Sequence, residues 1–265
     1  MKLLMYVSPF AIIGSFVFAQ TAPDTGVGQL PAQSTAIKGV LVPVPKEIFG
    51  TLDKFAHSNW RAVQRPELTQ WKTPSNQAET ALMLGVVIAE GFIAVEAEDA
   101  AEVKNVGRSV LKLARALGVE EAALRRSRSI VEHAEAGDWT GVRKEWDGVL
   151  PDVQQGMNEL KSEQLAQLVS LGGWLRGTEA LTTLILQNYS VEHAELLRQP
   201  ALLNHFEQRL ADMSDDIKTN PIIVRVRDGT QKIRPLIAPE HVPISQNDVR
   251  EIFLISEAIL KHFKR

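Results

Sequence analysis

The chain has no cysteine and few aromatic residues, since Phe, Trp and Tyr together make up 6% of its 265 residues. Without thiols it can form no disulfides, thiolate metal sites, iron–sulfur clusters, cysteine nucleophile or acylated lipobox cysteine. Charge of neither sign dominates, and a net charge of −3 gives no reason to expect nucleic acid as a partner. Hydrophobic residues make up 45%, enough for the core of one domain or two small domains.

Residues 1–19 predict a signal peptide. Lys2 supplies a positive start, and the uncharged, mostly apolar stretch that follows ends at Ala19, in the manner of an A-x-A cleavage site. The alternative is an uncleaved membrane anchor, but the stretch is shorter than the roughly 20 apolar residues that a spanning helix needs. We expect cleavage after Ala19 or Ala22, no transmembrane segment afterwards, and a periplasmic or secreted protein. The lack of cysteine favours the bacterial periplasm.

Residues 20–45 are rich in Pro, Gly, Ser and Thr and poor in charge, which predicts a flexible linker. Residues 46–265 are then expected to form a single all-α domain, an irregular multi-helix bundle built from αα-hairpins. Apolar residues recur at helical spacing there, and Gly, Pro or Ser mark the ends of most segments. The expected helices span about 74–98, 100–117, 119–136, 162–187, 191–218 with a bend at Pro200, and 245–263, and one further helix begins at Trp139.

Three segments carry more specific predictions. Residues 74–98 follow a Thr73 N-cap and are apolar nearly all round, which suits a core helix or a membrane span; Glu90 shortens the run and favours the core. Residues 221–237 fit a helical stripe, which we favour, or a hairpin turning at Asp228-Gly229. Ser245 to Asp248 form a capping box. The tryptophans at 60, 71, 139 and 146 are expected in the core.

Short sequence motifs that mark catalytic, metal-binding or nucleotide-binding sites are mostly missing. The sequence has no HExxH, no Glu three residues before any His, no P-loop and no G-x-S-x-G, and Gly26-Val27-Gly28 lacks the third glycine of a dinucleotide loop. Ser109 to Lys112 match S-x-x-K, but the companion motifs of penicillin-recognising enzymes are absent. We therefore expect no cofactor and no metal, and any catalysis would need a site assembled from distant residues.

One constellation is a charged group within apolar helices. Arg176 emerges beside small residues on a largely apolar face, where Gly173 and Gly177, four residues apart, would let another helix approach closely. A buried guanidinium needs a carboxylate partner, and Glu90 and Glu179 are the natural candidates. The group is either an ion pair that fixes how two helices align or a pocket for a carboxylate or anionic head group.

The other constellation is a basic row on the helix predicted at 100–117. Lys104, Arg108, Lys112 and Arg115 are spaced 4, 4 and 3 residues apart and share one side of that helix. The row is either an ordinary solvated face or a contact surface for an anionic partner.

These observations favour a non-enzymatic function. We expect an exported helical binding or scaffold module for an envelope partner protein or a small anionic ligand. The alternatives are an enzyme with a dispersed site around Glu90, Arg176 and Glu179, and a purely structural envelope protein.

Overall fold

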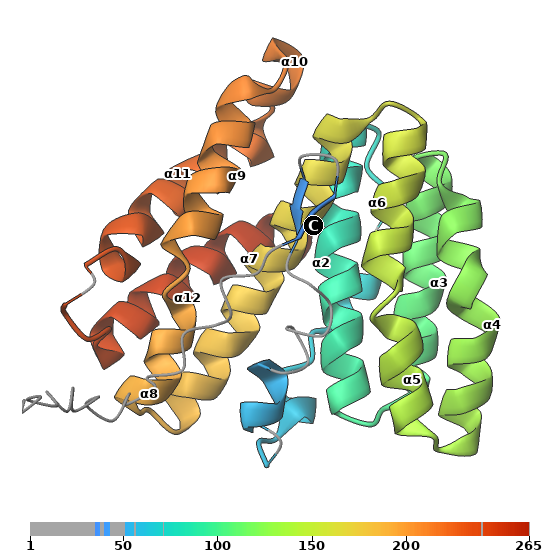
Figure 1. Cartoon of the computed structure of the whole chain (residues 1–265), viewed down its shortest axis with the longest axis horizontal. Coiled ribbons are helices and arrows are strands. Elements are labelled where there is room, and N and C mark those ends of the chain that lie inside the picture. The colour runs from blue at the N-terminus through green and yellow to red at the C-terminus, as the bar shows by residue number, and fades with distance from the viewer. Residues whose placement is uncertain are drawn as a thin grey trace, which may run out of the picture.

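The computed structural model describes residues 35–37, 40–42, 51–55, 57–70, 72–239 and 241–264. These residues are helical apart from connections and two short strands, which confirms the predicted all-α bundle (Figure 1). The predicted signal peptide at 1–19, its cleavage positions Ala19 and Ala22, and Trp71 lie outside the described residues.

Eleven α-helices and five short 3-10 helices have bounds that the described residues define. The α-helices are α2 (Gln77–Glu96), α3 (Ala100–Ala116), α4 (Glu120–Ala136), α5 (Trp139–Trp146), α6 (Val149–Glu159), α7 (Glu163–Gln187), α8 (Val191–Ala194), α9 (Pro200–Asp212), α10 (Asp215–Lys218), α11 (Pro221–Ile237) and α12 (Gln246–Leu260). The 3-10 helices are η1 (Asp53–Phe55), η2 (Trp60–Ala62), η3 (Pro66–Thr69), η4 (Glu195–Leu197) and η5 (Lys261–Lys264).

Two strands lie within the segment predicted to be a linker. β1 (Thr35–Ile37) and β2 (Val40–Val42) pair antiparallel, with Thr35 opposite Val42. β2 lies against α7, so this part of the segment follows the surface of the helical domain.

Local capping decides where several helices begin and end. The predicted Thr73 cap is wrong: α2 starts later, because the Asn76 side chain accepts a hydrogen bond from the Glu79 amide at 3.1 Å. α3 and α4 end as predicted at Gly118 and Gly137, whose φ angles of 77° and 71° lie in the left-handed region that glycine adopts without strain.

The prediction of one helix from 191 to 218 is wrong, because the structure has four shorter helices there, α8, η4, α9 and α10. Pro200 does not bend a continuous helix but occupies the first turn of a new one, α9, where its missing N–H costs no hydrogen bond. The ambiguous segment 221–237 is helical, as favoured, and the Asn220 side chain caps it at the Ile222 amide. The capping box at Ser245 and Asp248 is confirmed.

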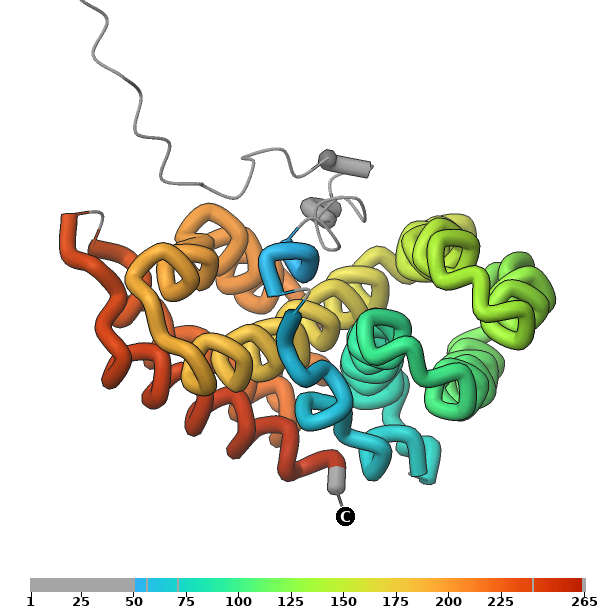
Figure 2. Tube along the Cα trace, turned by 90° about the horizontal axis from the view of Figure 1, so that it is seen from below, coloured from blue at the N-terminus to red at the C-terminus, as the bar shows by residue number. Residues whose placement is uncertain are grey.

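α2 and α7 form the centre of the bundle and lie side by side in both views (Figures 1 and 2). α3, α4 and α5 pack on the α2 side, α6 contacts both central helices, and α9, α11 and α12 pack on the α7 side. The two central backbones touch: a Cβ added to Gly85 would overlap the carbonyl oxygen of Val169, and one added to Gly172 would overlap that of Leu82. The predicted close approach at Gly177 is wrong, since nothing lies within 4 Å of a Cβ placed there.

α2 is a core helix rather than a surface one. By length and hydropathy it could span a membrane, and it is the only such helix among the described residues, but 89% of that stretch is buried inside the protein. Trp146 of α5 packs where a Gly91 Cβ would stand and donates its indole N–H to the Ile88 carbonyl at 3.2 Å. Trp60 is buried as expected, whereas Trp139 is only partly buried at the edge of the core.

Candidate functional site

The three residues of the predicted charged group meet in the interior. Arg176 and Glu90 are completely buried and Glu179 is 1% exposed. Arg176 donates from Nε to Glu90 Oε2 at 2.8 Å, from Nη1 to Glu179 Oε2, and from Nη2 to the Val63 carbonyl at 2.7 Å. The predicted pairing of Arg176 with both carboxylates is therefore present.

A second arginine completes this group. The Arg65 backbone N–H donates to Glu90 Oε1 at 2.5 Å, and its Nη2 donates to Glu179 Oε1 at 2.9 Å. Sequence reasoning missed Arg65, although two carboxylates against one buried guanidinium already call for a second cation. We call Arg65, Glu90, Arg176 and Glu179 the buried ion cluster.

The buried ion cluster has balanced charge and satisfied hydrogen bonds. All four carboxylate oxygens accept a bond from one of the two arginines. An anion would have to displace Glu90 or Glu179 to reach Arg176. This geometry matches the first of the two interpretations, an ion pair that aligns helices, and it also holds the segment around Val63 and Arg65 against α2 and α7.

The structure divides the basic row on α3. Lys104 pairs with Glu135 of α4 at 2.7 Å, and Arg115 makes an ion pair with Glu120 just beyond its own helix. Arg108 and Lys112, between them, line a groove of about 320 Å³. The four cations are therefore not equivalent, because only the middle two border this groove.

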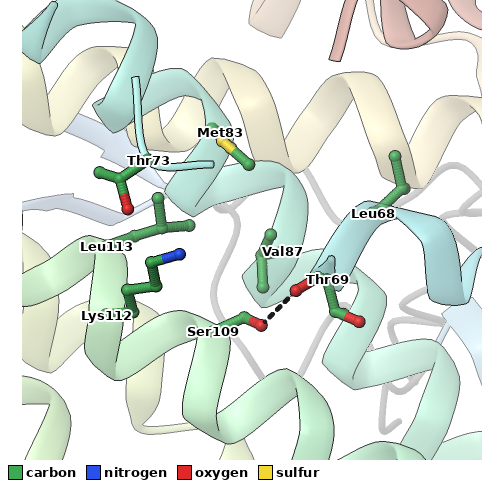
Figure 3. Close-up of a pocket in the computed structure, with 8 residues that line it drawn as sticks. All are labelled: Leu68, Thr69, Thr73, Met83, Val87, Ser109, Lys112 and Leu113. Atoms are coloured by element: carbon green, nitrogen blue, oxygen red, sulfur yellow. Dashed lines mark hydrogen bonds between the residues drawn. The ribbon is translucent and has the colours of Figure 1, made fainter. Parts of the chain in front are cut away.

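The groove runs between η3 with the residue after it and one side of α3. It is lined by Pro66, Thr69, Gln70, Glu102, Asn105, Arg108, Ser109 and Lys112. A much smaller cavity of about 10 Å³ adjoins it and shares Thr69, Ser109 and Lys112 (Figure 3). Ser109, the serine of the S-x-x-K match, donates a hydrogen bond from its hydroxyl to the Thr69 carbonyl at 2.9 Å. This bond links α3 to η3, the two elements that line the groove.

Glu102 is the unusual residue of this groove, and sequence reasoning missed it. It is only 7% exposed, and its Oε2 accepts a hydrogen bond from the Asn105 amide at 3.0 Å. Its Oε1 is buried and meets no donor among the described residues. Burial raises the pKa of Glu102, since a desolvated carboxylate is less stable. Asn105 also accepts from Arg108, so one amide links the buried acid to a guanidinium.

A second group of carboxylates gathers around Arg143 of α5, away from this groove. Arg143 contacts Asp53 of η1 and Glu96 of α2 at 2.5 and 2.6 Å. Asp147, beside them, has a buried Oδ1 that meets no donor among the described residues. Burial raises the pKa of Glu96 and raises that of Asp147 to about 6. In the described part of the chain, no three His, Asp or Glu side chains are arranged to hold a metal ion.

We expect Asp147→Asn to remove a pH dependence of stability. With its pKa raised from 3.8 to about 6, folded Asp147 binds its proton more tightly than the unfolded chain does. The free energy of unfolding should therefore fall as pH rises from about 4 to about 6 and stay level above. Asp147→Asn should flatten that fall and add about 1 kcal/mol at pH 7.5, a figure reduced for solvent screening of this half-buried side chain.

Urea denaturation of both proteins between pH 4 and pH 8 measures this effect. Asp228→Asn, at an exposed position on α11, serves as the matched control and should leave the pH profile unchanged. An unaltered slope in Asp147→Asn would contradict the assignment.

No family model, curated protein or solved structure matches this chain.

Proposed function

We propose that this chain is a binding protein whose groove between η3 and α3 takes a small anionic ligand. The observation that carries the proposal is the position of Arg108 and Lys112, which both line the groove beside the polar groups of Gln70, Asn105 and Ser109. A guanidinium and an ammonium together recognise carboxylate or phosphate groups well, because charged hydrogen bonds are about twice as strong as neutral ones.

The size and the charge of the groove support this proposal. Its volume of about 320 Å³ lies at the lower end of the range for small-molecule sites. The outer cations of the basic row pair with Glu135 and Glu120 away from the groove, so Arg108 and Lys112 are the two cations of the row that border it. An extended contact with an anionic surface would instead use all four cations.

The alternatives gain less support. A catalytic site around Glu90, Arg176 and Glu179 would need access for a substrate, whereas these side chains are almost completely shielded from solvent and bonded to one another or to Arg65. Export to the periplasm or beyond, and binding of an envelope partner protein, stay predictions from the sequence.

We expect Arg108→Gln/Lys112→Gln to weaken binding of a small dianion at least about tenfold, because each charged hydrogen bond contributes roughly 1.5–3 kcal/mol. Glutarate and ethyl phosphate are suitable probes, titrated against the ¹⁵N-labelled protein by NMR. Amides of residues 66–70 and 102–112 should shift in the wild-type protein.

The matched control is Lys104→Gln/Arg115→Gln, which removes the same charge from the same row outside the groove. Its affinity should stay within about twofold of wild type after correction for net charge. Equal losses in the two double variants would contradict binding in the groove. A wild-type protein that binds neither these probes nor their ammonium-bearing analogues, L-glutamate and O-phosphoethanolamine, would refute the proposed function.

A further inference from the structure

The buried acid in the groove restricts what its ligand can be. Glu102 lines the groove with Arg108 and Lys112, and its Oε1 is the groove's one buried side-chain atom, among the described residues, that lacks a hydrogen-bond partner. A simple anion would gain from the two cations but would be repelled by this carboxylate. A ligand that satisfies all three groups must offer a donor as well as negative charge.

We infer that the ligand is a small zwitterion with one ammonium group and two negative charges, as in an acidic amino acid or an aminoalkyl phosphate. This inference rests on the proposed function. One ammonium opposite Glu102 and two negative charges opposite Arg108 and Lys112 match the groove charge for charge, with a ligand of net charge −1 facing a groove of net charge +1.

The order of the side chains along α3 gives the ligand a direction. Glu102, Asn105, Ser109 and Lys112 are spaced 3, 4 and 3 residues apart and line one side of the groove. The Arg108 guanidinium reaches back to Asn105, the residue that holds Glu102, which shortens the distance that a small ligand has to cover. The ammonium would lie at the Glu102 end, and the negative groups would lie at Arg108 and toward Lys112.

The Glu102 carboxylate is suited to receive an ammonium. Oε2 is held by Asn105, which fixes the carboxyl group, and Oε1 has no donor among the described residues. A buried acceptor without a donor is costly, and a charged donor from the ligand would offset that cost. Burial raises the pKa of Glu102, and an ammonium beside the carboxylate would lower that pKa again.

Two matched pairs of compounds test the inference on the wild-type chain. L-Glutamate and glutarate differ by one ammonium group, as do O-phosphoethanolamine and ethyl phosphate. In at least one pair we expect the ammonium compound to bind at least about tenfold more tightly, the effect of one charged hydrogen bond. The pair that shows the preference distinguishes a carboxylate from a phosphate ligand.

The outcomes separate this inference from the proposed function. If glutarate and ethyl phosphate bind in the groove as tightly as their ammonium counterparts, the zwitterion inference is wrong and the anion site stands. If none of the four compounds binds, both fail.

The variant Glu102→Gln tests whether the Glu102 carboxylate causes the preference for the ammonium compounds. It should abolish the advantage of the ammonium compound, while the matched control Glu121→Gln, at an exposed position of α4, should keep it. An ammonium preference that survives in a folded Glu102→Gln variant, with folding checked by circular dichroism, would place the ammonium elsewhere and overturn the inference.

Discussion

Replacing Arg176 by alanine should lower the free energy of unfolding by about 3–5 kcal/mol, the range measured when one partner of a buried ion pair is removed. The variant leaves Glu90 and Glu179 buried beside the single charge of Arg65, whose side chain is 23% exposed. It also frees the Val63 carbonyl, which loses its bond at 2.7 Å from Arg176 Nη2. Two desolvated carboxylates without their common partner outweigh any gain in helix propensity from alanine.

Urea denaturation followed by circular dichroism measures this loss. Arg128→Ala is the matched control: Arg128 also pairs with a glutamate, Glu132 one turn away, but its side chain is 90% exposed. Because solvent screens an exposed pair of this kind, Arg128→Ala should leave the free energy of unfolding close to that of the wild-type protein. A loss of under 1 kcal/mol in Arg176→Ala would contradict the description of the buried ion cluster as a stabilising unit.

The same variant distinguishes the cluster from the groove. Under the proposed function, folded Arg176→Ala should bind glutarate as tightly as the wild-type protein does, because Arg176 contacts Glu90, Glu179 and Val63 and does not line the groove. A specific loss of binding in the folded variant would instead favour a ligand pocket at Arg176.

The sequence predicted those parts of the fold and site that depend on spacing within one helix or on charge balance. Arg176 and Glu179 are one helical turn apart, and a buried guanidinium in an apolar helix requires an acid, which led to Glu90. Arg65 could not be placed, because it belongs to an irregular segment whose path is set by tertiary contacts rather than by periodicity.

The basic row shows the same limit. Helical spacing placed Lys104, Arg108, Lys112 and Arg115 on one side of α3, yet the partner of Lys104 is supplied by the neighbouring helix α4 and the opposite wall of the groove by η3. The sequence pattern within residues 100–117 therefore predicts neither the ion-pair partner of Lys104 nor the wall that faces α3. At Pro200 the sequence indicated an interruption, but propensity alone could not distinguish a bend from a new helix start.

The α2–α7 contact should be the part of the fold most sensitive to a single methyl group. We expect Gly85→Ala and Gly172→Ala each to lower the free energy of unfolding by about 3 kcal/mol, although alanine favours a helix by about 1 kcal/mol. A Cβ on Gly85 would overlap the Val169 carbonyl oxygen and lie 2.8 Å from the Gly173 nitrogen. Both neighbours are backbone atoms, so no side chain can rotate away to relieve the overlap.

Gly177→Ala is the control, because we expect it to change the free energy of unfolding in the opposite direction. Gly177 lies in the same helix as Gly172, but a Cβ there has nothing within 4 Å, so alanine should raise stability by about 0.5–1 kcal/mol. Thermal and urea denaturation of the three variants would show two losses and one gain if the central helices touch through their backbones. Gains at all three positions would mean that α2 and α7 lie further apart, in which case the buried ion cluster between them could not close as described.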